Sequence, residues 1–287
     1  MTMRSLFFAL ALWTTASGAQ AAGRDIEARY GLDEIAFRKA SADLFAAGYR
    51  LIDITVAEVK GAPVIGGVFQ RMDGGPTGPE RATQLQDLLF LHQTRDQLTA
   101  TGARVGPQGS QLDVIDAYES NGQTVFAASF SPPGEPTIAT VGVFLTQPQA
   151  ADMRRQARAS NNDLARWDVY QDGDQLRYLP SFVPRANAEI SSLTADGSIQ
   201  FNANSIARDL GNESPLSISA YITKTGTIGY AGLFDDQAGR RSVIGLTLDE
   251  FHKKMDPLIA GGAMIVDLDS ATLGDTVFYS AVYVPAR

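Results

Sequence analysis

A pattern of alternating large and small apolar residues recurs five times along this chain. Each copy has an aromatic residue or isoleucine at its first position, a small residue or proline at its third, and an aromatic residue at its fifth. The copies occupy residues 65–69, 126–130, 178–182, 230–234 and 279–283. In an extended strand, residues two positions apart share one face, so each copy places its rings and its small residue in one row. The recurrence predicts a tandem repeat protein.

The residues around the first copy predict the repeating unit. Apolar residues at helical spacing precede a glycine suited to end a helix, and two alternating segments, 49–59 and 64–71, follow it. The positions that predict the helix, its end and the turn are Leu32, Phe37, Leu44, Gly48, Lys60 and Gly61. The unit is therefore expected to be a helix followed by a strand hairpin.

The other copies carry similar signals. The last unit repeats the first without a gap, because Phe251 and Tyr283 follow Phe37 and Phe69 by the same interval. Pairs of the type that form helix capping boxes are Thr83 with Gln86, Thr146 with Gln149, and Thr247 with Glu250. Expected helix ends are Gly102, Asn161, Gly211 and Gly262, a short helix is expected at residues 206–210, and Asp172 with Gly173 predicts a hairpin turn.

These signals predict an α+β protein. We expect five tandem helix-strand-strand repeats that form a mixed, curved or closed sheet with the helices on the outside. The expected units are approximately residues 30–72, 84–131, 141–184, 198–235 and 244–285, within a single repeat domain at residues 22–287. The first and last units match each other well and are apolar throughout, so we expect them to be neighbours rather than polar end caps.

The first 21 residues have the features of a signal peptide. Arg4 provides a positive charge, residues 6–15 are apolar but too few to span a bilayer, and Ala19 and Ala21 form a small-residue cleavage site. We therefore expect an exported protein, periplasmic or secreted, that is not inserted in a membrane after cleavage.

Composition excludes several classes of site. The chain has no cysteine, so disulfides and thiolate metal sites are absent, and it has a formal net charge of −8. That charge, without a cluster of basic residues, argues against a nucleic-acid partner. No phosphate-binding loop, zinc-protease motif, dinucleotide fingerprint or nucleophile elbow occurs. We expect no cofactor and no metal, and we assign no catalytic residue.

Three sets of residues remain as candidates, each with a structural alternative. The aromatic rows are expected to form core, although an exposed row of Tyr178, Tyr230, Tyr279 and Tyr283 could bind a glycan or peptide. His92 and His252, interpreted as equivalent helix positions, are expected at the surface or in packing rather than as ligands or bases. Asp53 and Asp267 lie in apolar strands, where a carboxylate can act as an acid or base or, as we prefer, accept hydrogen bonds from a neighbouring strand or helix.

Several segments resemble a known repeat. Residues 28–32 (ARYGL), Phe37, Leu44, residues 48–51 (GYRL) and residues 230–234 (YAGLF) resemble the bacterial tandem repeat found in the N-terminal part of polyglycine hydrolases. The third unit departs from this pattern, since Asn161 and Asn162 replace its glycine and tyrosine, and the tryptophan usual after the closing strand is missing. The resemblance implies an architecture and no chemistry. In that family, catalysis belongs to a separate β-lactamase-like domain with an SxxK motif, and no serine here has lysine three residues later.

The sequence thus favours a non-catalytic module that binds or scaffolds in the periplasm or outside the cell. Its partner is expected to be a protein, a peptide or a glycan. Two alternatives remain: a hydrolase of envelope polymers that uses carboxylates at a cleft between repeats, and an inhibitor or assembly partner of another secreted protein.

Overall fold

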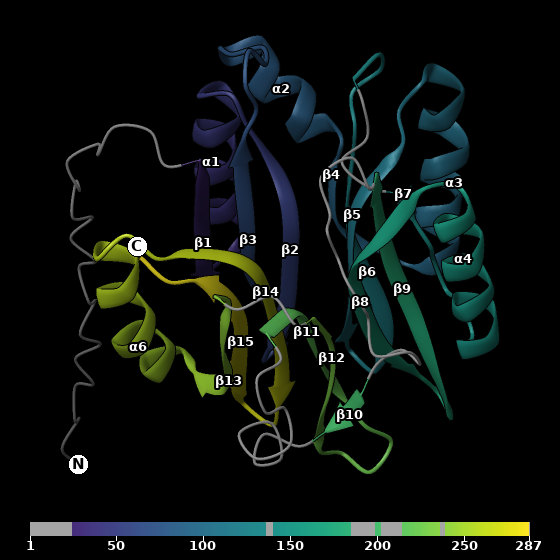
Figure 1. Ribbon diagram of the computed structural model, residues 1–287, viewed down its shortest axis with the longest axis vertical. Coiled ribbons are helices and arrows are strands. Elements are labelled where there is room, and N and C mark those ends of the chain that lie inside the picture. Colours follow the sequence, from purple (N-terminus) through teal and green to yellow (C-terminus); the bar gives the residue numbers. More distant parts are fainter. Residues whose placement is uncertain (1–24, 136–139, 185–198, 202–213, 236–238, 287) are drawn as a thin grey trace, which may run out of the picture.

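The computed structural model describes residues 25–135, 140–184, 199–201, 214–235 and 239–286. Within these residues the chain forms five α-helices and five antiparallel sheets of three strands each (Figure 1). The first sheet contains β1 (Ile26–Leu32), β2 (Tyr49–Val59) and β3 (Ala62–Arg71); the second contains β4 (Leu89–Gln93), β5 (Leu112–Ser120) and β6 (Gln123–Phe130); the third contains β7 (Thr140–Val141), β8 (Asn162–Asp172) and β9 (Gln175–Pro184); the fourth contains β10 (Ile199–Phe201), β11 (Ser214–Ile222) and β12 (Ile228–Asp235); and the fifth contains β13 (Arg241–Thr247), β14 (Met264–Leu273) and β15 (Thr276–Val284). The helices are α1 (Glu34–Ala46), α2 (Pro79–Asp87), α3 (Arg95–Val105), α4 (Gln147–Ala159) and α6 (Leu248–Ala260), with a 3₁₀ turn η1 (Gly106–Gln108) after α3.

All five sheets have the same strand order. The last strand of each sheet lies in the middle, as in β1-β3-β2 and β13-β15-β14. The expectation of one mixed sheet is therefore wrong: the sheets are small, separate and antiparallel, and none of them is closed. The unit expected from the sequence also lacked its leading strand. In the first, second, third and fifth sheets that strand precedes the helix. In all five sheets it pairs with the middle strand, which is also the second strand of the hairpin.

Local chemistry determines the helix ends. Asp33 caps α1 by accepting a hydrogen bond from the amide of Ala36 at 2.7 Å, and Gly48 and Gly262 follow α1 and α6 with φ of 88° and 102°. The capping boxes of Thr146 with Gln149 and Thr247 with Glu250 are confirmed. The turn at Lys60 and Gly61 is confirmed as well. The hairpin predicted from Asp172 and Gly173 is present, but its turn lies one residue later, at Gly173 and Asp174. Residues 206–210 and Gly211 lie outside the described residues.

The second sheet corrects the helix predicted over residues 83–102. This segment contains α2, then β4, then α3, and Gly102 lies inside α3 rather than at its end. Thr83 and Gln86 form no capping box. Gln86 instead donates to Ser41 and to the carbonyl of Arg38 on α1, and the capping box belongs to Thr94 and Gln97. Leu89 and Leu91 alternate with partly exposed neighbours, which is the periodicity of a strand.

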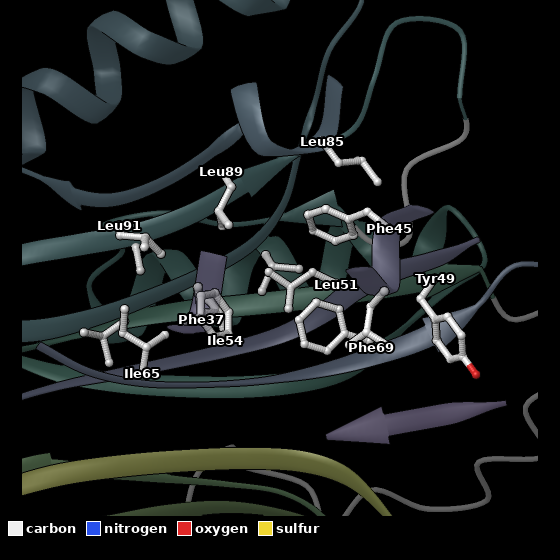
Figure 2. Packing of buried hydrophobic residues seen from close by; sticks show 14 of the residues in the cluster. Phe37, Phe45, Tyr49, Leu51, Ile54, Ile65, Phe69, Leu85, Leu89 and Leu91 are labelled. Carbon is white, nitrogen blue, oxygen red and sulfur yellow. The ribbon is translucent and has the colours of Figure 1, made fainter. Parts of the chain in front are cut away.

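The apolar core lies between neighbouring sheets. Figure 2 shows Phe37 and Phe45 of α1 facing Leu51 and Ile54 of β2, with Leu85, Leu89 and Leu91 of the following segment packed against them. Similar clusters join the second sheet to the third, the third to the fourth, the fourth to the fifth and the fifth to the first. Each sheet thus gains its buried surface from two neighbours.

The repeated small residue has a steric role in the first sheet. A Cβ on Gly67 would lie 2.8 Å from Leu51 Cδ1 and 3.2 Å from Phe37. Because such approaches are too close, a larger residue in β3 would push α1 away from the sheet. The large residues at the two ends of this row, Ile65 and Phe69, are fully buried.

The sheets meet through one edge strand each: β2, β5, β8, β11 and β14, which we call the seam strands. Strand β2 contacts β5 and β14, β11 contacts β8 and β14, and β5 contacts β8. Each seam strand has a register irregularity at the same place, directly after the residue that pairs with the closing aromatic of the middle strand, as Leu51 pairs with Phe69. This shared register makes positions comparable between sheets.

Candidate functional site

Two layers of polar side chains lie where the seam strands meet. The first seam layer, two residues beyond the residue that pairs with the closing aromatic, contains Asp53, Val114, Arg166, Ser217 and Asp267. The second seam layer, two residues further along, contains Thr55, Asp116, Asp168, Ser219 and Asp269. Nine of these ten residues carry a polar side chain inside otherwise apolar strands.

Side chains of the first seam layer accept backbone amides of the adjacent sheet. The amide of Leu268 donates to Asp53 Oδ2 at 2.7 Å, and the amide of Ile218 donates to Asp267 Oδ2 at 2.9 Å. Ser217 Oγ accepts the amide of Trp167 at 3.3 Å. The preferred interpretation of Asp53 and Asp267 as acceptors for a neighbouring strand is therefore confirmed.

The second seam layer repeats this arrangement. Asp116 Oδ2 accepts the amide of Val56 at 2.7 Å, and Asp269 Oδ2 accepts the amide of Ala220 at 2.7 Å. Ser219 Oγ accepts the amide of Val169 at 3.0 Å. An edge strand needs acceptors for its outward amides, and these side chains provide them where no strand ladder continues.

Arg166 is the basic residue of the two layers. It extends from the third sheet to form ion pairs with Asp53 of the first sheet and, at 3.7 Å, with Asp267 of the fifth. Burial lowers the pKa of Arg166, but the charges of Asp53 and Asp267 outweigh it and the pKa is raised from its ordinary value. One guanidinium thus links three sheets.

The carboxylates of the two layers have raised pKa values. Burial raises the pKa of Asp53 to about 8 against the opposing effect of Arg166, and burial raises that of Asp116 to about 7. Burial together with Asp116 and Asp168 raises the pKa of Asp269 well above its usual range, and burial raises that of Asp267. Such groups can exchange protons near neutrality, yet the exposed fractions of Asp53 and Asp267 are only 6% and 3%.

Asp168 differs from the other carboxylates. In this layer, Ser219 and Asp269 each accept the amide that follows the layer residue of the adjacent sheet. The same relation would give the Asp168 carboxylate the amide of Ala117 in the second sheet, but that amide donates to Asp116 Oδ1 at 2.7 Å. Among the described residues we find no hydrogen bond to the Asp168 carboxylate. Burial, followed by the charges of Asp267 and Asp53, raises its pKa well above the usual range.

A pocket of about 580 Å³ lies at the hairpin ends of the five sheets, next to the second seam layer. All five seam strands contribute to its wall. The seam-strand residues nearest the carboxylates are Val56, Ala117, Ala220 and Ser270, and Tyr170 represents the third sheet. The charged side chains that line it are Glu58, Glu119 and Lys224. Its position on five elements makes it the best candidate for a ligand site.

Comparison with known families gives one result. Residues 23–72 match the polyglycine hydrolase-like structural repeat. The resemblance predicted from the sequence is confirmed for this segment, which contains α1 and the three strands of the first sheet. No curated protein matches the chain significantly.

The match concerns a structural repeat and names no catalytic group in it. Within the polyglycine hydrolase-like repeat, Asp53 and Thr55 contribute to the two seam layers, and Val56 and Glu58 line the pocket. The repeat is therefore one of five contributors to both features. The described residues include no group of histidine and acidic side chains placed to hold a metal ion, and no helix there is long and apolar enough to cross a bilayer.

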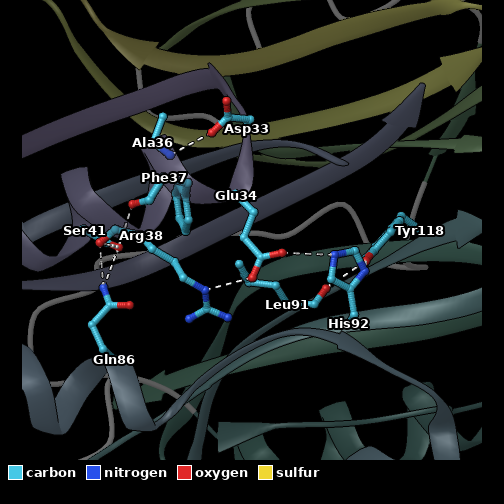
Figure 3. A network of polar contacts seen from close by, with 10 residues as sticks. All are labelled: Asp33, Glu34, Ala36, Phe37, Arg38, Ser41, Gln86, Leu91, His92 and Tyr118. Atoms are coloured by element: carbon cyan, nitrogen blue, oxygen red, sulfur yellow. Dashed lines mark hydrogen bonds and ion pairs between the residues drawn. The ribbon is translucent and has the colours of Figure 1, made fainter. Parts of the chain in front are cut away.

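His92 connects the polyglycine hydrolase-like repeat to the second sheet. Figure 3 shows the imidazole between Glu34 of α1 and Tyr118 of β5. Its Nε2 lies 3.7 Å from Glu34 Oε2, its Nδ1 contacts the Tyr118 hydroxyl, and that hydroxyl also donates to the carbonyl of Leu91 at 2.8 Å. Burial, with the nearby charge of Asp116, raises the pKa of Tyr118, so the phenol remains neutral.

The expectation that His92 and His252 are equivalent is wrong. His92 lies on β4, one residue before Gln93, whereas His252 lies on α6. His252 Nδ1 lies 3.0 Å from Asp256 Oδ2, and Asp256 Oδ1 accepts the hydroxyl of Tyr30 at 2.5 Å. His92 contacts Glu34 of α1 and Tyr118 of the second sheet, whereas the centroid of the His252 ring lies 5.1 Å from that of Tyr30 in the first sheet.

The four tyrosines considered for ligand contact are all buried. The exposed fractions of Tyr178, Tyr230, Tyr279 and Tyr283 lie between 0% and 6%. None of these rings faces solvent in this structure, as a core role requires. Any contact of theirs with a ligand stays a prediction.

Sequence reasoning missed Arg166, Asp116 and Asp269. The signal was present for the last two, because they stand at the same interval from the closing aromatic of their units as Thr55 does. Aligning the five copies on that aromatic would have revealed a recurrent polar position. Arg166 had no such signal, since the other members of its layer are acidic, hydroxylic or apolar.

Proposed function

We propose that this protein is an exported, non-catalytic module of five repeats that binds a ligand at the hairpin pocket. Its place of action is the periplasm or the extracellular space. The polyglycine hydrolase-like repeat at residues 23–72 supports the repeat architecture, and the proposal extends that architecture to the four sheets that follow.

In the proposed arrangement, the five units form a ring through their seam strands, with the helices on the outside. The common strand order and the common register irregularity support five equivalent units. Contacts of β2 with both β5 and β14 support the neighbourhood of the first and fifth units. Figure 1 is consistent with this arrangement, since α6 and the pair α3 and α4 lie toward opposite sides of the view.

The observation that carries the non-catalytic assignment is the use of the carboxylates. Four buried aspartates, Asp53, Asp116, Asp267 and Asp269, each accept an amide of a neighbouring sheet. These carboxyl groups therefore serve to join neighbouring units, and the pocket beside them remains available to a ligand. Scaffolds that bind through a pre-formed pocket need no reactive group there.

The test is binding to glycan and peptide arrays by the mature protein and two variants. Ala117→Trp places a large ring in the pocket wall, and Ala100→Trp places the same ring on the exposed side of α3 as a control. We expect an array signal for the wild type and Ala100→Trp that is lost in Ala117→Trp. A signal that Ala117→Trp retains in full would refute the pocket as the binding site. If the arrays show no signal with any form, the binding function itself is wrong.

The alternative of an envelope-polymer hydrolase rests on the neutral-range pKa values of Asp53 and Asp116. Incubation with peptidoglycan and with polyglycine peptides, followed by detection of new reducing ends or amines, tests it. Turnover that Asp53→Asn or Asp116→Asn abolishes, while the variants stay folded, would favour this alternative.

A further inference from the structure

The pocket wall carries more negative than positive charge. Its charged side chains are the carboxylates of Glu58 and Glu119 and the ammonium group of Lys224. Glu58 accepts a hydrogen bond from the hydroxyl of Ser120 at 2.5 Å, and Glu119 is exposed. An anionic ligand would meet repulsion here.

The backbone of the pocket wall points the same way, by an independent observation. The amides of Val56 and Ala117 donate to Asp116, and the amides of Ala220 and Ser270 donate to Asp269. All four donors belong to residues that line the pocket. Because these amides are used by buried carboxylates, they are not available to bind an anion or a ligand carbonyl. At these four positions the wall therefore offers no free backbone amide.

We infer that the hairpin pocket binds its ligand through a primary ammonium group, which Glu119 and Glu58 receive at the pocket wall. The inference rests on the proposed binding function and specifies its ligand chemistry. An ammonium group brings three donors and a positive charge, which complement the carboxylates of Glu58 and Glu119. A free diamine and the side chain of a peptide lysine share this chemistry.

The experiment measures binding by titration calorimetry with matched probes. The first pair is 1,4-diaminobutane and 1,4-butanediol, which have similar shape but differ in charge. The second pair is a capped Gly-Lys-Gly peptide and the same peptide with an acetylated lysine. The variants are Glu119→Gln, Lys224→Gln and, as a control on the exposed surface of α2, Glu80→Gln.

We expect the charged member of at least one pair to bind and its neutral partner not to bind. Glu119→Gln should weaken that binding about two- to fivefold, since the pair it forms is partly exposed, and Lys224→Gln should strengthen it by a similar factor. Glu80→Gln should leave it unchanged, and added salt should weaken it in the wild type. Binding of the peptide alone identifies a peptide ligand, and binding of both identifies the ammonium group as sufficient.

Any one of four results would overturn the inference. Equal binding of the neutral and charged probes, or equal affinities for all three variants, removes the role of charge. The absence of binding by every amine probe also refutes it, and an array signal lost in Ala117→Trp would then leave the proposed function standing with a different ligand. Amine binding that persists in Ala117→Trp places the ammonium site outside the pocket.

Discussion

Replacing Asp116 by asparagine should change how the stability of the protein depends on pH. The side chain of Asp116 is 9% exposed and accepts amides from Val56 and Ala117. Burial raises its pKa from 3.8 to about 7. A carboxyl whose folded pKa is raised stabilises the fold fully below its unfolded pKa, and this contribution is lost as the pH rises toward the folded pKa.

The size of the effect follows from the window between the two pKa values. From about pH 5 to about pH 7, the unfolded chain has released the proton and the folded chain still holds it. Each pH unit in this window costs about 1.4 kcal/mol, so Asp116 alone should remove about 3 kcal/mol of stability across it. Asparagine cannot ionise and should not contribute this loss.

The assay is urea unfolding of the wild type, Asp116→Asn and an exposed control, Asp73→Asn, at several pH values in this window. The asparagine amide will face one of the two backbone donors, which lowers stability at every pH by about 1–3 kcal/mol. The informative quantity is therefore the slope with pH, which should be shallower in Asp116→Asn by about 1.4 kcal/mol per unit. Asp73→Asn should follow the wild type. Parallel slopes for the wild type and Asp116→Asn would refute the assignment of a proton to this buried carboxyl.

Three further predictions concern the core, the export signal and the absence of a nucleophile. Phe130→Ala and Phe234→Ala should each lower the free energy of unfolding by about 3–5 kcal/mol, because both rings are buried; denaturant melts with changes near half a kcal/mol would contradict this. The intact mass of exported protein should correspond to a start near Ala22, and recovery of a species that retains Met1 would argue against a cleaved signal. Folded protein should not react with a fluorophosphonate probe, since the chain has no SxxK motif or nucleophile elbow; stoichiometric, heat-sensitive labelling of one serine would contradict the non-catalytic assignment.

The sequence predicted the hairpins well because their signals are local. Gly48, the turn at Lys60 and Gly61, and the aromatic rows act within a few residues, and the structure confirms each of them. The leading strands were missed because their pairing is not local: β1 pairs with β3, and the helix and a further strand lie between the two in the chain. In β4, only five residues carry the strand pattern, and the helix-favouring residues on both sides obscured it.

The candidate site was predictable only in part. Asp53 and Asp267 drew attention because a carboxylate in an apolar strand needs a partner, and the partners are amides of adjacent sheets. The pocket could not be predicted, since its wall combines residues from five hairpins whose relative placement no local pattern encodes. The role of Arg166 depends on the same placement, because it reaches the first and fifth sheets from the third.

The hydrogen bond between Leu268 and Asp53 joins residues 215 positions apart in the chain. The equivalent bond between Trp167 and Ser217 spans 50 positions. Because the entropy of loop closure grows only with the logarithm of length, the longer closure costs only about 1 kcal/mol more at equilibrium. Its effect is on timing instead: during synthesis, the first sheet must wait for the fifth, and contacts of such high sequence separation slow folding. Until then the acceptor on β2 and the apolar side of the first sheet stay uncovered, so a chain that ends before β14 should lose the order of its first sheet as well as its last.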